Sequence, residues 1–249
     1  MMERVGDPFR RIIAIVARLR DPATGCDWDR VQTFASIAPY TVEEAYEVAD
    51  AIARGDMASL REELGDLLFQ VVLHARIAEQ AGHFTLSDVG SEIADKMERR
   101  HPHLFGDAVM RPDWETLKAA ERPSDASALD DIALALPALM RAEKLQKRAA
   151  RTGFDWPDRS GPRAKIDEEL VEVEGATSEA ALVEEVGDLL FSVVNFARHL
   201  GVDPESALRG ANGKFERRFR MIEREPGFVE LSLAAKEALW RQAKLARLA

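Results

Sequence analysis

The sequence predicts an all-α protein made of two tandem repeats of a helical bundle. Apolar residues recur at spacings of three and four over most of the chain, which is the period of an amphipathic helix. The strict alternation of apolar and polar residues that marks a strand is almost absent. The string EELGDLLFQVVLHAR at 62–76 occurs again as EEVGDLLFSVVNFAR at 184–198, with 11 of 15 positions identical. Such self-similarity at a fixed separation indicates a duplicated domain.

Four segments carry the helical period most clearly, and they place the main helices expected in each repeat. Gly55, Gly82 and Gly201 are expected to stop helices, and Gly201 is followed shortly by Pro204. We expect four or five helices in each repeat. The segment 228–233 (FVELSL) is the one place where a strand is equally compatible with the pattern. The four helical segments are 42–53, 63–78, 182–200 and 207–223.

Five paired blocks follow the same order in both halves, and they set the predicted domain boundaries. We expect an N-terminal repeat over 1–120 and a C-terminal repeat over 132–249. The polar, turn-rich segment 121–131 (ERPSDASALDD) is interpreted as the linker. The paired blocks outside the string above are Gly25-x-Asp27-Trp28 with Gly153-x-Asp155-Trp156, Glu43-Glu44-x-x-Glu47 with Glu168-Glu169-x-x-Glu172, Lys96-x-x-Arg99-Arg100 with Lys214-x-x-Arg217-Arg218, and Trp114-x-x-x-Lys118 with Trp240-x-x-x-Lys244.

Composition excludes several classes of function. The net charge of −10 argues against a general nucleic-acid binder, because that affinity rests on clustered positive charge. Cys26 is the only cysteine, so neither an intramolecular disulfide nor a Cys-rich zinc site can form. No uncharged apolar run approaches the roughly 20 residues that span a bilayer. We expect a cytoplasmic protein that has neither membrane nor nucleic acid as a partner.

Acidic pairs on consecutive predicted helices form the candidate functional site. Residues three apart on a helix share a face, so Glu169 and Glu172 make one carboxylate pair, and Glu185 and Asp188 make another. The Leu-Leu-Phe run after Asp188 is expected to face the core, which brings these like charges together near apolar groups. Buried charges must be paired or bind a metal. Oxygen ligands without His or Cys favour Mg²⁺ or Mn²⁺. The same set occurs in the first repeat as Glu44, Glu47, Glu63 and Asp66.

Two other interpretations of the acidic pairs were weighed. A single E-x-x-D motif is usually a solvated helix face, but a solvated face has no reason to recur in register with glycine, aspartate and an apolar run. Ferritin-like di-iron bundles also place carboxylates on facing helices, but they use Glu-x-x-His on two of them. Asp66 and Asp188 stand where that histidine would be, which leaves iron chemistry a minor alternative.

The combination of E-E-x-x-E, E-x-x-D and K-x-x-R-R resembles the MazG family of nucleoside triphosphate pyrophosphohydrolases in its two-repeat form. The likeness covers nearly the whole chain and includes PALMRAEKLQKRAARTGFDWPD (137–158), NGKFERRF (212–219) and the late Trp-Lys pair. The resemblance implies an all-α fold with a helical bundle from each repeat and association as a homodimer. It also implies Mg²⁺-dependent release of pyrophosphate from a broad set of NTPs and dNTPs.

The resemblance also implies roles for particular residues. Family members can carry a basic residue four positions before the glutamate that matches Glu185, where this chain has Ala181, so that phosphate contact is not carried over. Trp240 would stack on the base, with Lys244 nearby. The implied Mg²⁺ ligands are Glu169, Glu172, Glu185 and Asp188, and the residues implied to hold the triphosphate are Lys165, Lys214, Arg217 and Arg218.

The second repeat is expected to be the main catalytic centre, with the first as a second metal site or a support for dimerisation. In the first repeat Met97 and His101 replace Phe215 and Phe219, and His101-Pro102 is expected to end the helix early. Lys96, Arg99 and Arg100 match the basic residues of the second repeat.

Hydrolysis between the α- and β-phosphates needs an aligned water and cations for the developing charge. As a hypothesis, Glu168 orients or deprotonates the attacking water, and Lys214 and Arg218 neutralise the charge of the triphosphate. These residues also have plainer interpretations. The basic residues could form an ordinary exposed helix face. Phe215 and Phe219 are expected in the core rather than on the base, and Trp240 could serve packing alone. House-cleaning of the nucleotide pool is the inferred purpose. The rival function is a non-catalytic protein that senses Mg-nucleotide; a purely structural bundle explains the duplicated motif less well.

Overall fold

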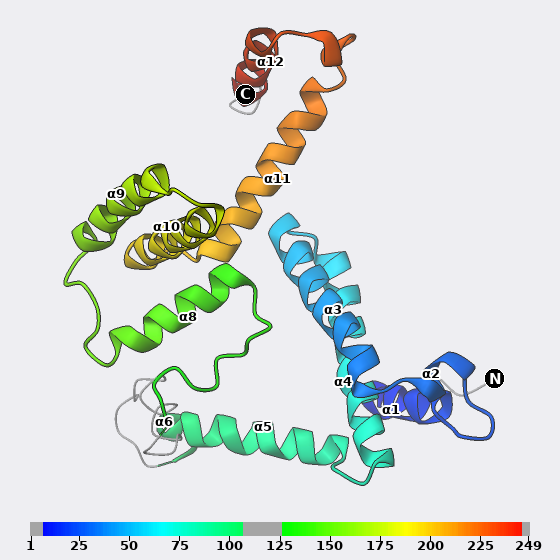
Figure 1. Cartoon of the computed structure of the whole chain (residues 1–249). Helices are drawn as coiled ribbons and strands as arrows, with labels where there is room; N and C mark the ends of the chain where they lie inside the picture. The colour runs from blue at the N-terminus through cyan, green and yellow to red at the C-terminus, as the bar shows by residue number, and fades with distance from the viewer. Residues whose placement is uncertain (1–6, 107–125, 246–249) are drawn as a thin grey trace. The chain divides into compact units, whose positions relative to one another are not determined.

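The computed structural model describes residues 7–106 and 126–245, and its regular structure is helical (Figure 1). No strand occurs in those two ranges, so the all-α prediction is confirmed. The chain divides into two compact units, residues 1–123 and 124–249, and each is considered by itself. The predicted linker 121–131 straddles this division and stays a prediction. Trp114 and Lys118 lie outside the described residues.

The first unit is built on a hairpin of two long helices, α3 (Phe34–Arg54) and α4 (Met57–Gln80). Gly55 makes the turn between them with a φ of 68°, in the left-handed region that glycine tolerates best. α1 (Pro8–Leu19) packs on α4, and Val16, Ile37 and Leu73 form the centre of a small core. The remaining helices are α2 (Asp27–Val31), α5 (Leu86–Arg100) and α6 (Pro102–Phe105).

The second unit repeats the hairpin as α9 (Ser160–Gly175) and α10 (Glu179–His199), with α8 (Ala138–Ala150) packed against α10. α11 (Pro204–Ile222) begins beside α8 and α10 and then runs away from them, and α12 (Leu233–Leu245) lies against its far half (Figure 1). We call α11 and α12 the arm. The ambiguous segment 228–233 holds the short 3₁₀ helix η1 (Phe228–Glu230), which removes the strand alternative there.

The predicted helix stops are confirmed. Gly82 and Gly201 follow α4 and α10 with φ values of 73° and 69°, and Pro204 opens α11 with Asp203 as its N-cap. α5 ends at Arg100, whereas α11 continues four residues beyond Arg218, its counterpart in the second repeat. The helix therefore ends early at His101-Pro102, as the sequence predicts.

The expectation that the Leu-Leu-Phe run faces the core is wrong within one chain. Leu190 is 53% exposed and Phe191 42% exposed. With Leu182, Val186 and Val193, Leu190 forms an exposed line at helical spacing, which we call the α10 stripe. Leu64, Leu68 and Val71 form the matching α4 stripe. The apolar period is helical as predicted, but the helices in the described part of the chain leave this side of the hairpin exposed.

None of the helices in the described ranges combines the length and the apolar character that a bilayer crossing requires.

Candidate metal and nucleotide site

The α9–α10 hairpin brings three of the four predicted second-repeat carboxylates together. Carboxylate oxygens of Glu169, Glu172 and Glu185 all lie within 4.8 Å of one another. Glu169 is only 2% exposed, and its Oε2 is buried without a hydrogen-bond partner among the residues that the structure describes. A buried carboxylate oxygen without a donor is costly, which points to a cation as its partner.

The electrostatics of this cluster agree with that interpretation. Desolvation is the main effect that raises the pKa of Glu172, and the charges of Glu169 and Glu185 raise it further, while Lys165 opposes them. The contributions of Glu169 and Glu185 show that these carboxylates repel one another when all are charged. A divalent cation would relieve this repulsion.

Lys165 lies one turn before Glu169 on α9 and supplies the nearest positive charge. Its Nζ is 2.6 Å from Glu169 Oε1 and 2.9 Å from Glu168 Oε1. Hydrogen bonds to Glu169 and then Glu168 raise the pKa of Lys165, so the ammonium stays charged at neutral pH. Glu168 is the predicted water-orienting residue; it is exposed, and its Oε1 accepts the hydrogen bond from Lys165.

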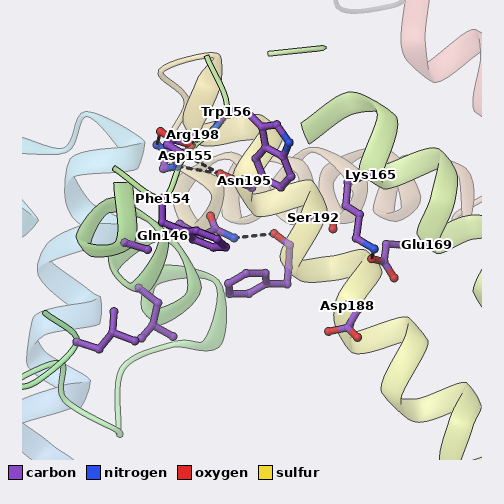
Figure 2. Close-up of a pocket in the computed structure, with 14 residues that line it drawn as sticks. Gln146, Phe154, Asp155, Trp156, Lys165, Glu169, Asp188, Ser192, Asn195 and Arg198 are labelled. Carbon is purple, nitrogen blue, oxygen red and sulfur yellow. Dashed lines mark hydrogen bonds and ion pairs between the residues drawn. The ribbon is translucent and has the colours of Figure 1, made fainter. Parts of the chain in front are cut away.

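Asp188, the fourth predicted ligand, is not among the carboxylates that lie within 4.8 Å of one another, but it lines the same cavity as Glu169. It lines a cavity of about 490 Å³ together with Lys165 and Glu169 (Figure 2). Ala181, where a basic residue is missing, lies in the first turn of α10 and its backbone N–H donates to Ser178 Oγ.

The cavity extends from the carboxylates toward α8 and the loop before α9. Figure 2 shows Lys165, Glu169 and Asp188 at one end and Gln146 and Arg198 at the other, with Trp156 along the side. Sequence reasoning did not single out Gln146, Phe154, Asn195 or Arg198. Gln146 and Phe154 lie in the 137–158 string that carries the family resemblance, and Asn195 and Arg198 lie in the 184–198 block, so the signal was present but its use was not visible without the fold.

A charged clamp fixes the loop that carries Trp156. Arg198 Nη1 donates to Asp155 Oδ2 at 2.9 Å, and His199 Nε2 lies 3.0 Å from Asp155 Oδ1. The hydrogen bond from Arg198 is the main effect that lowers the pKa of Asp155 to about 2. The clamp ties this loop to the end of α10, whereas Asp27, the matching residue of the first repeat, pairs with Arg30.

We expect the thermal stability of Asp155→Asn to fall less than that of wild type as the pH is lowered from 7 to 2.5. The folded state holds the Asp155 pKa at about 2 against an ordinary 3.8, so the stabilisation is complete above about pH 5 and disappears as the pH falls toward 2. The loss at pH 7 should be on the order of 1–2 kcal/mol, since the pair is only partly shielded from solvent. Thermal unfolding midpoints between pH 7 and pH 2.5 measure this, and equal slopes for wild type and variant would contradict it.

The predicted basic and aromatic residues gather on the arm. The Arg218 guanidinium lies 5.9 Å from the centroid of the Trp240 ring, and Phe215 lies 5.3 Å from the same ring. Lys214, Arg217 and Lys244 are exposed on the same two helices. The expectation that Phe215 is a core residue is wrong within one chain, because it is 57% exposed. Since α11 leads away from the hairpin, one chain does not gather all the predicted site residues around one point (Figure 1).

The first repeat carries a second carboxylate cluster. Oxygens of Glu44, Glu63 and Asp66 lie within 4.8 Å of one another on α3 and α4. Desolvation raises the pKa of Glu44 and of Glu63, and neighbouring carboxylates, including a hydrogen-bonded Glu47, raise both further. On α5, Lys96 Nζ lies 3.6 Å from Glu92 Oε1. The same helix carries Arg99 and Arg100.

Comparisons with known proteins identify the family. A family model of the MazG nucleotide pyrophosphohydrolase domain matches residues 32–105, and one of phosphoribosyl-ATP pyrophosphohydrolase matches residues 136–214. The nucleoside triphosphate pyrophosphohydrolase of Escherichia coli (strain K12) is 50% identical over 252 residues, covering 94% of this chain and 96% of that protein. The nucleoside triphosphate pyrophosphohydrolase/pyrophosphatase MazG of Thermotoga maritima is 44% identical and covers 98% of both chains. The chain therefore belongs to the MazG family of nucleotide pyrophosphohydrolases, with one pyrophosphohydrolase domain in each half.

Proposed function

We propose that this protein hydrolyses NTPs and dNTPs of broad base range to nucleoside monophosphate and pyrophosphate, with Mg²⁺ as the metal. The observation that carries the proposal is the cluster of Glu169, Glu172 and Glu185 with its buried, unpartnered Glu169 oxygen, at one end of a cavity large enough for a nucleotide. An all-oxygen donor set fits Mg²⁺, with Mn²⁺ as the alternative ion. The names of the E. coli and T. maritima relatives support the reaction.

The residues divide the work as follows. Glu169, Glu172, Glu185 and Asp188 would hold the metal, which when bound polarises phosphate oxygens and neutralises their charge. Lys165, whose pKa is raised, keeps its charge for the triphosphate beside them. Lys214, Arg217 and Arg218 make charge-assisted hydrogen bonds to the phosphates as the pyrophosphate leaves. Trp240 stacks on the base, and Lys244 contributes a further positive charge.

A homodimer would complete this site. The α10 stripe exposes a line of apolar side chains, and exposed apolar lines of this kind mark association surfaces. The α4 stripe offers the same kind of surface in the first repeat. Because the arm leads away from its own α9–α10 hairpin, we propose that a second copy supplies the arm that reaches the carboxylate cluster. Each fully buried large apolar side chain would contribute about 1.5–3 kcal/mol to such an interface.

The first-repeat cluster is proposed as a second metal centre, with Glu44, Glu47, Glu63 and Asp66 as ligands. It shares the mutual proximity of carboxylates and their raised pKa values with the second repeat. The proposed setting is the cytoplasm, the proposed purpose is removal of unwanted nucleotides from the pool, and membranes and nucleic acids are not among the proposed partners.

The test is a panel of NTPs and dNTPs incubated with the full chain and Mg²⁺, with pyrophosphate and orthophosphate assayed separately. Pyrophosphate from most of the panel is the expected result. Orthophosphate alone would replace the proposal with a different phosphohydrolase. Mg-dependent nucleotide binding without either product would support the sensing function instead. Loss of activity in Glu172→Ala would assign the reaction to the second repeat, and loss of activity in Glu47→Ala would assign it to the first.

Glu168→Gln tests the water-orienting role. We expect kcat to fall about a hundredfold, because the amide cannot accept the proton of the attacking water, while the apparent Mg²⁺ affinity stays within about twofold. The amide oxygen can still accept the hydrogen bond from Lys165, so the local structure should persist. An unchanged kcat would refute this role. Glu174→Gln, on the exposed end of the same helix, is the matched control.

A further inference from the structure

The end of the cavity farthest from the carboxylates contains a buried hydrogen-bond acceptor with no partner. Gln146 on α8 is 6% exposed, and its Nε2 donates to the backbone oxygen of Phe191 at 2.8 Å (Figure 2). A carbonyl oxygen can only accept, so the orientation of the Gln146 amide is fixed by chemistry. Oε1 is therefore the free end, and it is buried with no hydrogen bond. Buried polar atoms of this kind normally have a partner, which the cavity leaves room for.

Asn195 on α10 supplies a donor at the same end. Its Oδ1 accepts hydrogen bonds from Arg198 Nε at 2.9 Å and Nη2 at 2.7 Å. A guanidinium only donates, so the Asn195 amide is also fixed, and Nδ2 is the end that remains for the cavity. Asp155 holds Arg198 in turn. The two buried amides thus offer one acceptor and one donor in fixed orientations.

The first repeat has neither amide. In the frame that pairs Trp28 with Trp156, Gln146 corresponds to Arg18, and in the frame of the 62–76 and 184–198 blocks, Asn195 corresponds to Leu73. The shared helical fold therefore does not require these amides. Amides at these two positions are therefore a feature of the second repeat, beside its cavity.

The walls of this end suit a flat ring. Phe154, Trp156 and Phe191 line the cavity beside the two amides. Its volume of about 490 Å³ lies within the roughly 300–1,000 Å³ of typical small-molecule sites. A nucleotide whose phosphates lie at Lys165 and Glu169 would extend its nucleoside toward Gln146 and Asn195 (Figure 2).

We propose that Gln146 and Asn195 read the edge of the nucleobase, an inference that rests on the proposed function. Gln146 Oε1 accepts from an exocyclic amino group or ring N–H, and Asn195 Nδ2 donates to the neighbouring ring nitrogen or carbonyl oxygen. Adenine, cytosine, guanine and uracil all present a donor beside an acceptor on the edge used for base pairing. The pair therefore accepts a broad set of bases and disfavours a base that lacks the donor.

The experiment compares ATP with purine riboside 5′-triphosphate, which lacks the exocyclic amino group. We expect wild type to prefer ATP about tenfold in kcat/KM, because the analogue leaves Gln146 Oε1 unpaired. Gln146→Met, which keeps the side-chain volume, should bring the ratio close to one. Asn195→Leu, which introduces the residue found at the matching position of the first repeat, should remove discrimination against 1-deaza-ATP, which lacks the ring acceptor.

Controls separate this inference from folding and from the proposed function. Gln70→Met removes a buried glutamine whose Oε1 is also unpartnered, but in the first repeat, and should keep the wild-type ratio. Calorimetric binding of AMP and purine riboside monophosphate needs no turnover, so a tenfold preference for AMP without pyrophosphate release would refute the proposed function and keep the base site. Wild type that treats the two nucleotides alike, or a Gln146→Met variant that still folds and discriminates, overturns the base site.

Discussion

Replacing Glu169 by alanine is expected to lower kcat/KM for NTPs by at least about a thousandfold. The substitution removes the most buried carboxylate of the cluster, whose Oε2 has no partner within residues 7–106 and 126–245. Loss of a metal ligand at the reacting phosphates removes charge stabilisation that the transition state needs most. Pyrophosphate release under saturating Mg²⁺ measures the loss, and calorimetry with Mg²⁺ alone should show weakened binding.

Two matched variants control that experiment. Glu174→Ala removes an exposed glutamate near the end of α9 and should leave turnover within about twofold of wild type. Glu63→Ala removes a carboxylate of the first-repeat cluster and reports how much activity that repeat contributes. Near-normal turnover in Glu169→Ala, with Mg²⁺ binding retained, would contradict the proposed metal site.

A charge in the middle of the α10 stripe is expected to separate the proposed homodimer and reduce activity more than a hundredfold. Val186 is exposed in one chain, so Val186→Glu should leave the fold of the monomer intact. In an interface, the same carboxylate would be buried without a partner, which proteins do not tolerate. Activity should fall with assembly, because the proposed site uses carboxylates from one copy and the arm of the other.

Light scattering during size-exclusion chromatography measures the assembly state, and circular dichroism confirms the helical fold. Val229→Glu makes the same substitution at a more exposed valine off the stripe, and it should stay dimeric and active. Adding Val186→Glu chains to wild type should leave the measured activity at the level of the wild-type chains alone, because the variant does not associate with them. A monomeric wild type that releases pyrophosphate at full rate would disprove the shared site.

Helix placement in this chain follows from local chemistry, which is why the sequence alone predicts it. The apolar period indicates the helices, and Gly55, Gly82 and Gly201 stop them where the backbone must adopt a positive φ. His101-Pro102 ends α5 early for an equally local reason, since the residue before proline avoids helical geometry. The pairing of Glu169 with Glu172 is also local, because three residues of helix set it.

Long-range contacts explain what the sequence did not predict. A helical period states that residues share a face, but not whether the same chain covers that face, so Leu190 and Phe191 were expected in the core and are exposed. Phe215 was misassigned for the same reason.

The sequence by itself determined the all-α class, the duplication and the composition of the acidic pairs, because these follow from periodicity, repetition and residue chemistry. Only the tertiary structure decided which residues meet across helices. It brought Glu185 of α10 to the carboxylates of α9, and it joined Asp155 to Arg198. It also left Gln146 Oε1 without a partner beside the cavity. The physical reason is that hydrogen bonding and burial depend on distances between segments, and those distances arise only when the helices pack.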